Sequence, residues 1–275
     1  MRRYWFLPVL PLAAVCVGLA NASAPPKELL PDLRILEPAS VQLCGGVDPA
    51  DPWRKQHCTP VGFGGQRLLR FDSVVYNTGA GPLDVAASRP NTATPVMRAV
   101  QRIKRTDGKS STYDGGALLD YALLQDGHPH WHTHGFEIYR LFRLDTPLPG
   151  GPRVGHKIGY CFFDGQIVRP ELPGFKKHAR YKFNGCGTKS SRNLTVGLSI
   201  GWGDSYPAEF AGQYVDVTGV PDGDYLLCIS ADPLGQFRES DEGDNDAWAR
   251  IALTSDGVSV STVGDTDCLQ QLPYA

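Results

Sequence analysis

Residues 214–229, YVDVTGVPDGDYLLCI, show the pattern that decides the fold of this chain. Two runs rich in β-branched, aromatic and other apolar residues, 214–217 and 225–229, flank a stretch with the proline, aspartate and glycine typical of turns. Apolar and polar residues alternate in the first run, as in a half-buried strand. Similar short runs recur at 68–71, 74–76, 83–85 and 136–144. The pattern predicts an all-β fold, a β-sandwich-like single domain with long loops.

Composition supports this prediction and excludes some functions. The 31 glycines and 22 prolines leave little room for long helices. The formal net charge is −2, so nothing indicates nucleic-acid binding. We expect one domain at residues 25–275, because no low-complexity linker divides the chain.

The first 24 residues are typical of a secretory signal. Arg2 and Arg3 precede an apolar stretch at 4–20, and the small residues around ANASA at 20–24 fit cleavage after Ala22 or Ala24. The alternative is an uncleaved membrane anchor, which the two prolines in the apolar stretch disfavour. We therefore expect a secreted or extracytoplasmic protein with no membrane attachment after cleavage.

Six cysteines remain after the signal. An even number in an exported chain indicates disulfides, with fifteen ways to pair them. Proximity in the sequence favours the pairs Cys44–Cys58, Cys161–Cys186 and Cys228–Cys268. The absence of a Cys-x-x-Cys motif makes a structural zinc site a poor interpretation.

Four of the seven histidines lie in one run, HPHWHTH at residues 128–134. Alternate residues of a strand point to one side, so an extended run presents every imidazole on one face. Imidazole nitrogens suit copper(II), zinc or iron(II). We assign His128, His130 and His132 as the ligands, with a bend at Pro129, and place His134 beside the metal or the substrate. The alternative is an exposed polar strand with incidental histidines.

Three segments, in matching order, resemble the catalytic domain of the lysyl oxidase family. The first is HPHWH at residues 128–132, which is similar to the copper motif of that family. The second is GHKIGYCFFD at 155–164, and the third is GLSIGWGDSY at 197–206. The resemblance implies copper(II) and a lysine tyrosylquinone cofactor made from Lys157 and Tyr206.

The resemblance also implies an activity. Lysyl oxidases oxidise primary amines, chiefly lysine side chains of proteins, with molecular oxygen, and release an aldehyde, ammonia and hydrogen peroxide. Asp204 is our candidate for the base that takes the α-proton, against a loop-capping role, and His134 and His156 are candidates for proton transfer or for positioning. The alternatives are a zinc or iron enzyme, and a secreted copper-binding β-sandwich without quinone chemistry. Neither alternative requires Lys157 and Tyr206 in their matching contexts.

Residues 170–191 are basic, rich in glycine and without clear periodicity. The animal enzymes are shorter between the equivalents of Lys157 and Tyr206. We expect this stretch to be a long loop that the pair Cys161–Cys186 holds, at the border of the site.

A second ion site is indicated by ESDEGDND at 239–246, where five acids and one amide lie in eight residues. Clustered oxygen ligands suit calcium. The segment resembles a calcium-binding segment of some lysyl oxidases, which implies Glu239, Asp241, Asp244 and Asn245 as ligands, with Asp32 as their partner. The alternative is a solvated acidic turn.

Overall fold

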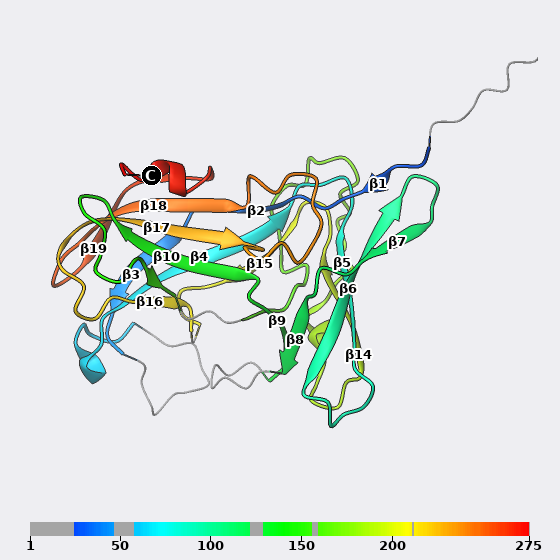
Figure 1. Ribbon diagram of the computed structural model, residues 1–275, viewed down its shortest axis with the longest axis horizontal. Coiled ribbons are helices and arrows are strands. Elements are labelled where there is room, and N and C mark those ends of the chain that lie inside the picture. The colour runs from blue at the N-terminus through cyan, green and yellow to red at the C-terminus, as the bar shows by residue number, and fades with distance from the viewer. Residues whose placement is uncertain (1–24, 47–57, 122–128, 156–158, 211, 275) are drawn as a thin grey trace, which may run out of the picture.

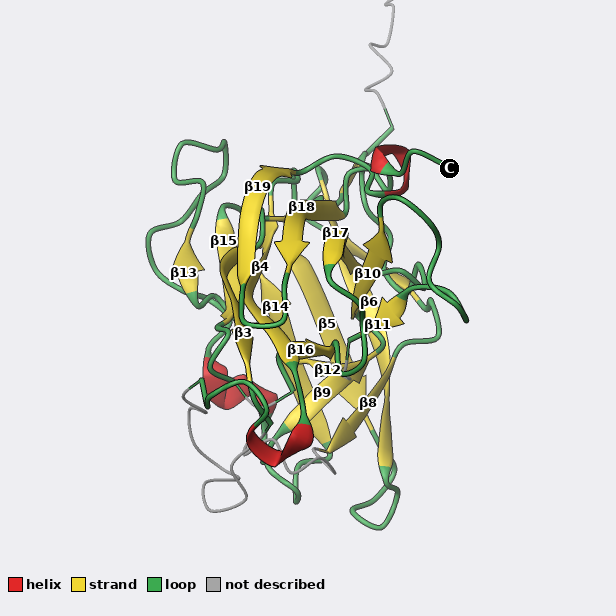
Figure 2. Cartoon of the chain, turned by 90° about the vertical axis from the view of Figure 1, so that its left-hand side faces the viewer, coloured by secondary structure: helices red, strands yellow, loops and turns green. Residues whose placement is uncertain are grey.

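The computed structural model describes residues 25–46, 58–121, 129–155, 159–210 and 212–274. In these residues the chain forms antiparallel sheets, and helical structure is confined to three short 3-10 turns. In Figure 2 one of these turns lies beside the C-terminus, and the others lie at the opposite end of the molecule. The prediction of an all-β fold is confirmed. The expected signal peptide, His128, His156 and Lys157 lie outside the described residues.

The largest sheet carries the histidine run. Its strands follow the order β12 (Gly159–Tyr160), β9 (Trp131–His134), β8 (Leu118–Tyr121), β6 (Val96–Arg105), β5 (Leu83–Ser88) and β14 (Asn193–Leu198). Two further strands, β1 (Glu28–Leu29) and β7 (Ser110–Tyr113), pair with β6. In Figure 1 this sheet occupies the right-hand part of the molecule.

The other two sheets occupy the left-hand part of Figure 1. One has the order β11 (Arg153–Val154), β10 (Glu137–Arg143), β17 (Gly223–Ala231), β18 (Asp246–Leu253) and β19 (Val258–Gly264). The other has the order β13 (Gln166–Ile167), β15 (Trp202–Tyr206), β4 (Leu68–Asn77) and β16 (Tyr214–Asp216), with β2 (Leu33–Ile35) and β3 (Ala39–Cys44) also on β4. The 3-10 turns are η1 (Phe63–Gly65), η2 (Phe183–Cys186) and η3 (Leu269–Gln271).

The two runs at 214–217 and 225–229 become strands β16 and β17, which belong to different sheets. β16 pairs with β4, whereas β17 pairs with β10 and β18. Residues 225–231 of β17 are all buried, so both faces of this central strand pack against other residues. The turn between the runs therefore carries the chain from one sheet to the next.

One hydrophobic core joins the three sheets. Val85, Val75 and Leu227 come from the eight-, six- and five-stranded sheets respectively, and all three are fully buried in the same cluster. The three disulfides pair as sequence proximity predicts: Cys44–Cys58, Cys161–Cys186 and Cys228–Cys268. Residues 170–191 contain no strand, only the turn η2, and Cys186 anchors them to Cys161. Within the described residues, no helix has the length and apolar character needed to cross a membrane.

Candidate functional site

One face of strand β9 lies in the core, and the other face carries histidines. Trp131 and Thr133 are fully buried, and they alternate with His130 and His132 on the other side of the chain. The indole of Trp131 donates to the Thr188 carbonyl at 2.8 Å, and the guanidinium carbon of Arg89 lies 4.6 Å from the ring centre. These contacts fix the strand from behind, so the histidines have a rigid base.

His130 and His132 are brought together. Their ring centres are 4.4 Å apart, closer than the roughly 6–7 Å between alternate residues of a flat strand. His130 is 7% exposed and His132 is 9% exposed, so both rings are shielded from bulk water. His134 differs: its side chain is 53% exposed, and Nδ1 lies 3.6 Å from Oδ2 of Asp120 on β8. The expected convergence of imidazoles is therefore present for two of the histidines.

The segment after Lys157 lies directly against this strand. β12 pairs with β9 in antiparallel register, with Gly159 opposite His134 and Tyr160 opposite Thr133. A Cβ atom on Gly159 would lie 2.5 Å from Cβ of His132, so only glycine fits without movement of one strand. Lys157, the lysine of the second motif, thus precedes by two residues in sequence the glycine that packs against His132.

Tyr206 lies at the end of β15 and is 7% exposed. Its phenol oxygen accepts a hydrogen bond from the backbone N–H of Cys161 at 3.2 Å, and its ring centre is 4.4 Å from that of Tyr160. A ring nitrogen of His130 and the sulfurs of Cys161 and Cys186 lie within 4.8 Å of one another. The sulfur of Cys161 therefore lies near the first motif, and its backbone N–H is bonded to the third motif.

The two cysteines near His130 are not metal ligands here. A metal binds the thiolate form of cysteine, and these sulfurs are joined in a disulfide. The disulfide instead connects Cys161 to η2, where Phe183 packs edge-on against His130 with ring centres 5.1 Å apart. Phe183 is 54% exposed, so an aromatic ring at the surface covers a buried histidine. The 170–191 loop does border the site, as expected.

Asp204 is fully buried two residues before Tyr206, which places both side chains on one face of β15. Tyr160 donates its hydroxyl to the backbone carbonyl of Asp204 at 2.8 Å. Burial raises the pKa of Tyr160 well above its usual value, and the negative charge of Asp204 adds to that rise. The Tyr160 phenol stays neutral and acts as a fixed donor at neutral pH.

Asp164 ends the second motif, and sequence reasoning gave it no role. Its carboxylate accepts hydrogen bonds from the backbone N–H groups of Arg180, Tyr181 and Ser199, at 2.7, 3.1 and 2.8 Å, and from the Ser199 hydroxyl at 2.8 Å. Since Ser199 belongs to the third motif, this buried aspartate ties the second motif, the 170–191 loop and the third motif together. The only signal in the sequence that could have indicated this role of Asp164 is its position as an acidic residue within a motif.

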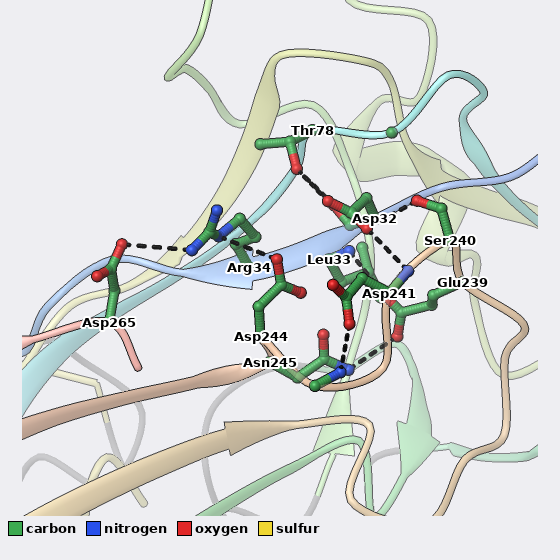
Figure 3. A network of polar contacts seen from close by, with 12 residues as sticks. Asp32, Leu33, Arg34, Thr78, Glu239, Ser240, Asp241, Asp244, Asn245 and Asp265 are labelled. Atoms are coloured by element: carbon green, nitrogen blue, oxygen red, sulfur yellow. Dashed lines mark hydrogen bonds and ion pairs between the residues drawn. The ribbon is translucent and has the colours of Figure 1, made fainter. Parts of the chain in front are cut away.

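The acidic residues form a second cluster, which Figure 3 shows. Oδ1 of Asp32 accepts a hydrogen bond from the N–H of Asp241 at 3.0 Å, although the two residues are 209 positions apart in the sequence. Asn245 donates its side-chain amide to Oε1 of Glu239 at 3.0 Å, and the N–H of Leu33 donates to Oε2 of Glu239. The structure thus brings all five residues of the expected calcium site together: Asp32, Glu239, Asp241, Asp244 and Asn245.

The electrostatics of this cluster favour a cation. Burial raises the pKa of Glu239 to about 9, and burial and the charge of Asp32 raise the pKa of Asp244. Oδ1 of Asp244 and Oδ1 of Asn245 are buried and have no hydrogen-bond partner among the residues that the structure describes. Arg34 supplies one positive charge, 3.6 Å from Asp244. Orphaned oxygen atoms next to clustered carboxylates match the ligand preference of calcium.

Comparison with known proteins identifies the family. The profile of the Lysyl oxidase family matches residues 122–263, more than half of the chain. Lysyl oxidase homolog 2B of Danio rerio is 26% identical over 180 residues, which are 66% of this chain and 18% of that protein. Protein-lysine 6-oxidase of Sus scrofa is 30% identical over 128 residues, 46% of this chain and 45% of that protein. The chain thus spans less than a fifth of the first relative and under half of the second. The matched region includes all three motifs, and on this basis the chain belongs to the lysyl oxidase family.

Proposed function

We propose that this protein is an exported, copper-dependent amine oxidase whose quinone cofactor forms from Lys157 and Tyr206. One observation carries the proposal: His130 and Tyr206 both lie near Cys161, His130 with a ring nitrogen within 4.8 Å of its sulfur and Tyr206 with its hydroxyl bonded to its N–H. A histidine that suits a redox-active metal and the tyrosine that must be oxidised therefore share Cys161 as a neighbour. The substrates we propose are primary amines, chiefly lysine side chains of proteins.

The residues present fit copper(II). Two shielded imidazoles with converging rings are suitable ligands, and the cysteines near them in the described residues are joined in a disulfide. We propose His128, His130 and His132 as the ligands. His134 is the alternative third ligand, because it follows His132 on the same face of β9 and its Nδ1 lies near Asp120, which could orient the ring.

Copper and the quinone would together supply the oxidation, in which amine, oxygen and water give aldehyde, ammonia and hydrogen peroxide. The chain supplies position and proton transfer. The backbone N–H of Cys161 holds the phenol oxygen of Tyr206, and the Tyr160 ring packs beside the Tyr206 ring. We propose that the Asp204 carboxylate takes the α-proton of the substrate, since it shares a face of β15 with Tyr206.

Two further elements complete the proposal. We propose calcium at Asp32, Glu239, Asp241, Asp244 and Asn245, on the strength of the orphaned oxygens and the raised carboxyl pKa values. Export is supported by the three disulfides, which form and persist in oxidising compartments.

The test is to load the purified protein with copper and measure three things: bound copper, quinone staining, and peroxide released from an alkylamine. We expect Lys157→Ala and Tyr206→Phe each to abolish the quinone and the peroxide while copper stays bound. We expect His130→Ala to lose copper and quinone together, and the exposed His178→Ala to behave as wild type. A wild-type protein with full copper but without quinone would support the copper-binding alternative instead.

The third ligand is settled by the same assay. His128→Ala and His134→Ala remove the two candidates separately, and the variant that loses copper identifies the ligand. Loss of copper in His134→Ala with full retention in His128→Ala would replace our assignment.

A further inference from the structure

One segment of the 170–191 loop contacts the histidine strand from both sides. The Phe183 ring packs edge-on against His130, with ring centres 5.1 Å apart. On the other side, the carbonyl of Thr188 accepts the indole N–H of Trp131 at 2.8 Å. His130 and Trp131 are neighbours in an extended chain, so their side chains point in opposite directions. The loop therefore clamps the strand between Phe183 and Thr188.

The part of the clamp behind the strand is a tight turn at residues 188–191. The N–H of Ser191 donates to the carbonyl of Thr188 at 2.9 Å, and the N–H of Thr188 donates to the hydroxyl of Ser191 at 3.0 Å. These bonds use the carbonyl of Thr188 but not those of Lys189 and Ser191. Both of these carbonyls accept hydrogen bonds from one side chain, that of Arg89.

Arg89 joins this turn to the sheet and to the indole. It directly follows β5, and its backbone N–H donates to the carbonyl of Arg192 at 2.9 Å. Its guanidinium carbon lies 4.6 Å from the centre of the Trp131 ring, within the range of a cation–π contact. Its side chain donates to four backbone carbonyls: through Nε to Ser191 at 2.8 Å, through Nη1 to Thr92 at 3.1 Å and to Thr94 at 2.8 Å, and through Nη2 to Lys189.

The geometry of this position requires an arginine. Arg89 is only 6% exposed, and all of its side-chain hydrogen bonds among the described residues go to neutral carbonyls. Burial of a charge is costly unless hydrogen bonds replace those to water. A planar guanidinium with five N–H groups can reach several carbonyls while its face lies on an aromatic ring, and a lysine ammonium cannot do both. The guanidinium therefore serves as a fixed brace behind the strand.

We propose that Arg89 is a positioning residue for the proposed copper site. Its guanidinium fixes the 188–191 turn and the Trp131 indole, and these hold His130 and His132 in their converging arrangement. Arg89 acts through Trp131, which lies between the two histidines in the sequence. The inference rests on the copper part of the proposed function and does not require the quinone.

The first test measures copper affinity in the full protein, by titration of metal-free protein with copper(II) against a competing chelator. We expect Arg89→Met to raise the Kd for copper roughly tenfold, the low end of the range for residues that orient metal ligands from outside. Arg89→Lys keeps the charge but loses the fork, so it should raise the Kd nearly as much. A wild-type Kd in Arg89→Met would overturn the proposal, and full rescue by Arg89→Lys would overturn the role of the fork.

The matched control is Arg67→Met. Arg67 also donates its guanidinium to backbone carbonyls, those of Val220 and Thr254, but these residues follow β16 and β18 and not the histidine strand. Arg67→Met should lower the unfolding free energy, measured in urea, and leave the Kd for copper unchanged. If both variants raise the Kd equally, the effect is one of general stability and the proposal is wrong.

A spectrum distinguishes positioning from stability. At saturating copper, the electron paramagnetic resonance spectrum of Arg89→Met should contain a second signal, because the imidazoles are no longer held in one arrangement. Arg67→Met should give the wild-type spectrum, since a loss of stability does not alter copper in the folded protein. A wild-type spectrum in Arg89→Met would contradict the positioning role.

A measurement on metal-free protein separates this inference from the function on which it rests. Backbone hydrogen exchange at residues 130–134 and 188–191 should be faster in Arg89→Met than in wild type, and unchanged there in Arg67→Met. Unchanged exchange at 130–134 in Arg89→Met would overturn the clamp. If wild type binds copper but forms no quinone, the proposed oxidase function fails and the role of Arg89 stands. If wild type binds no copper, both proposals fail.

Discussion

The histidine strand and the acidic cluster are both candidate ion sites, and they are built in opposite ways. The histidines come from one strand whose other face is buried in the core, so the protein is rigid there before any ion binds. The acidic cluster joins residue 32 to residues 239–245, which are far apart in sequence, and it leaves raised carboxyl pKa values. The first arrangement suits chemistry, since its geometry does not depend on the metal. In the second, binding of the proposed calcium ion would be coupled to the stability of the chain.

The largest expected effect comes from removing one of two disulfides, and it tests whether general stability and the proposed copper site depend on the same disulfide. Cys161→Ser/Cys186→Ser opens a loop of 25 residues and should cost about 3 kcal/mol of unfolding free energy. It also breaks the covalent link between η2, which carries Phe183, and Cys161 next to β12, so binding of copper at the proposed site should weaken. Urea unfolding and metal analysis measure the two effects.

The matched control is Cys228→Ser/Cys268→Ser, which opens a loop of 40 residues and whose cysteines pack with Leu226 in a small cluster separate from the main core. Its stability should fall by about as much, while copper binding should not change. If both double variants lose copper to the same extent, the loss reflects general destabilisation and Cys161 has no special place in the site.

The next effect concerns pH and the acidic cluster. The pKa of Glu239 is raised from 4.5 to about 9, so between these values the folded state holds a proton that the unfolded state has released. The unfolding free energy should therefore fall as pH rises through this window when calcium is absent. Added calcium favours the ionised carboxylate and should flatten the slope.

Glu239→Gln should remove most of this pH dependence, and the exposed Glu37→Gln should not. Urea unfolding at several pH values, with calcium or with a chelator, provides the measurement. If the unfolding free energy changes with pH to the same extent with and without calcium, the calcium assignment is wrong. The proposal of a copper site would not be affected by that result.

The smallest effect concerns the exposed ring over His130. Phe183→Ala should change the unfolding free energy by less than about 1 kcal/mol, because the side chain is 54% exposed. Copper should dissociate a few times faster, since the ring that covers the proposed ligand His130 is lost. Competition with a chelator gives the rate, with the exposed Ile167→Ala as control. Equal rates in the two variants would show that Phe183 does not protect the metal.

Much of the fold follows from local sequence, and the site follows only in part. Short runs rich in apolar and β-branched residues predicted β4, β10 and β17, because such runs between turn residues are a local property of the sequence. The disulfides matched sequence proximity. The local sequence could not predict that β16 and β17 belong to different sheets. Their partners, β4 and β10, lie far away in the sequence.

Long-range contacts explain what sequence reasoning missed in the site. Phe183 over His130 joins residues more than fifty positions apart, and the amide of Gln236 reaches His134 across 102 positions. Neither residue belongs to a motif. The link between Asp32 and Asp241 was anticipated only because the resemblance supplied a partner for the acidic turn. The proposed Lys157–Tyr206 pair stays a prediction.

Gly159 has a consequence for how this site tolerates change. With 2.5 Å between its missing Cβ position and that of His132, the two backbones are already as near as they can come. A single methyl group there would act as a wedge, and it would move the strand that follows Lys157 away from the histidines without altering any reactive group. The arrangement of the candidate site therefore depends on the lack of a side chain at residue 159 as much as on the reactive side chains themselves.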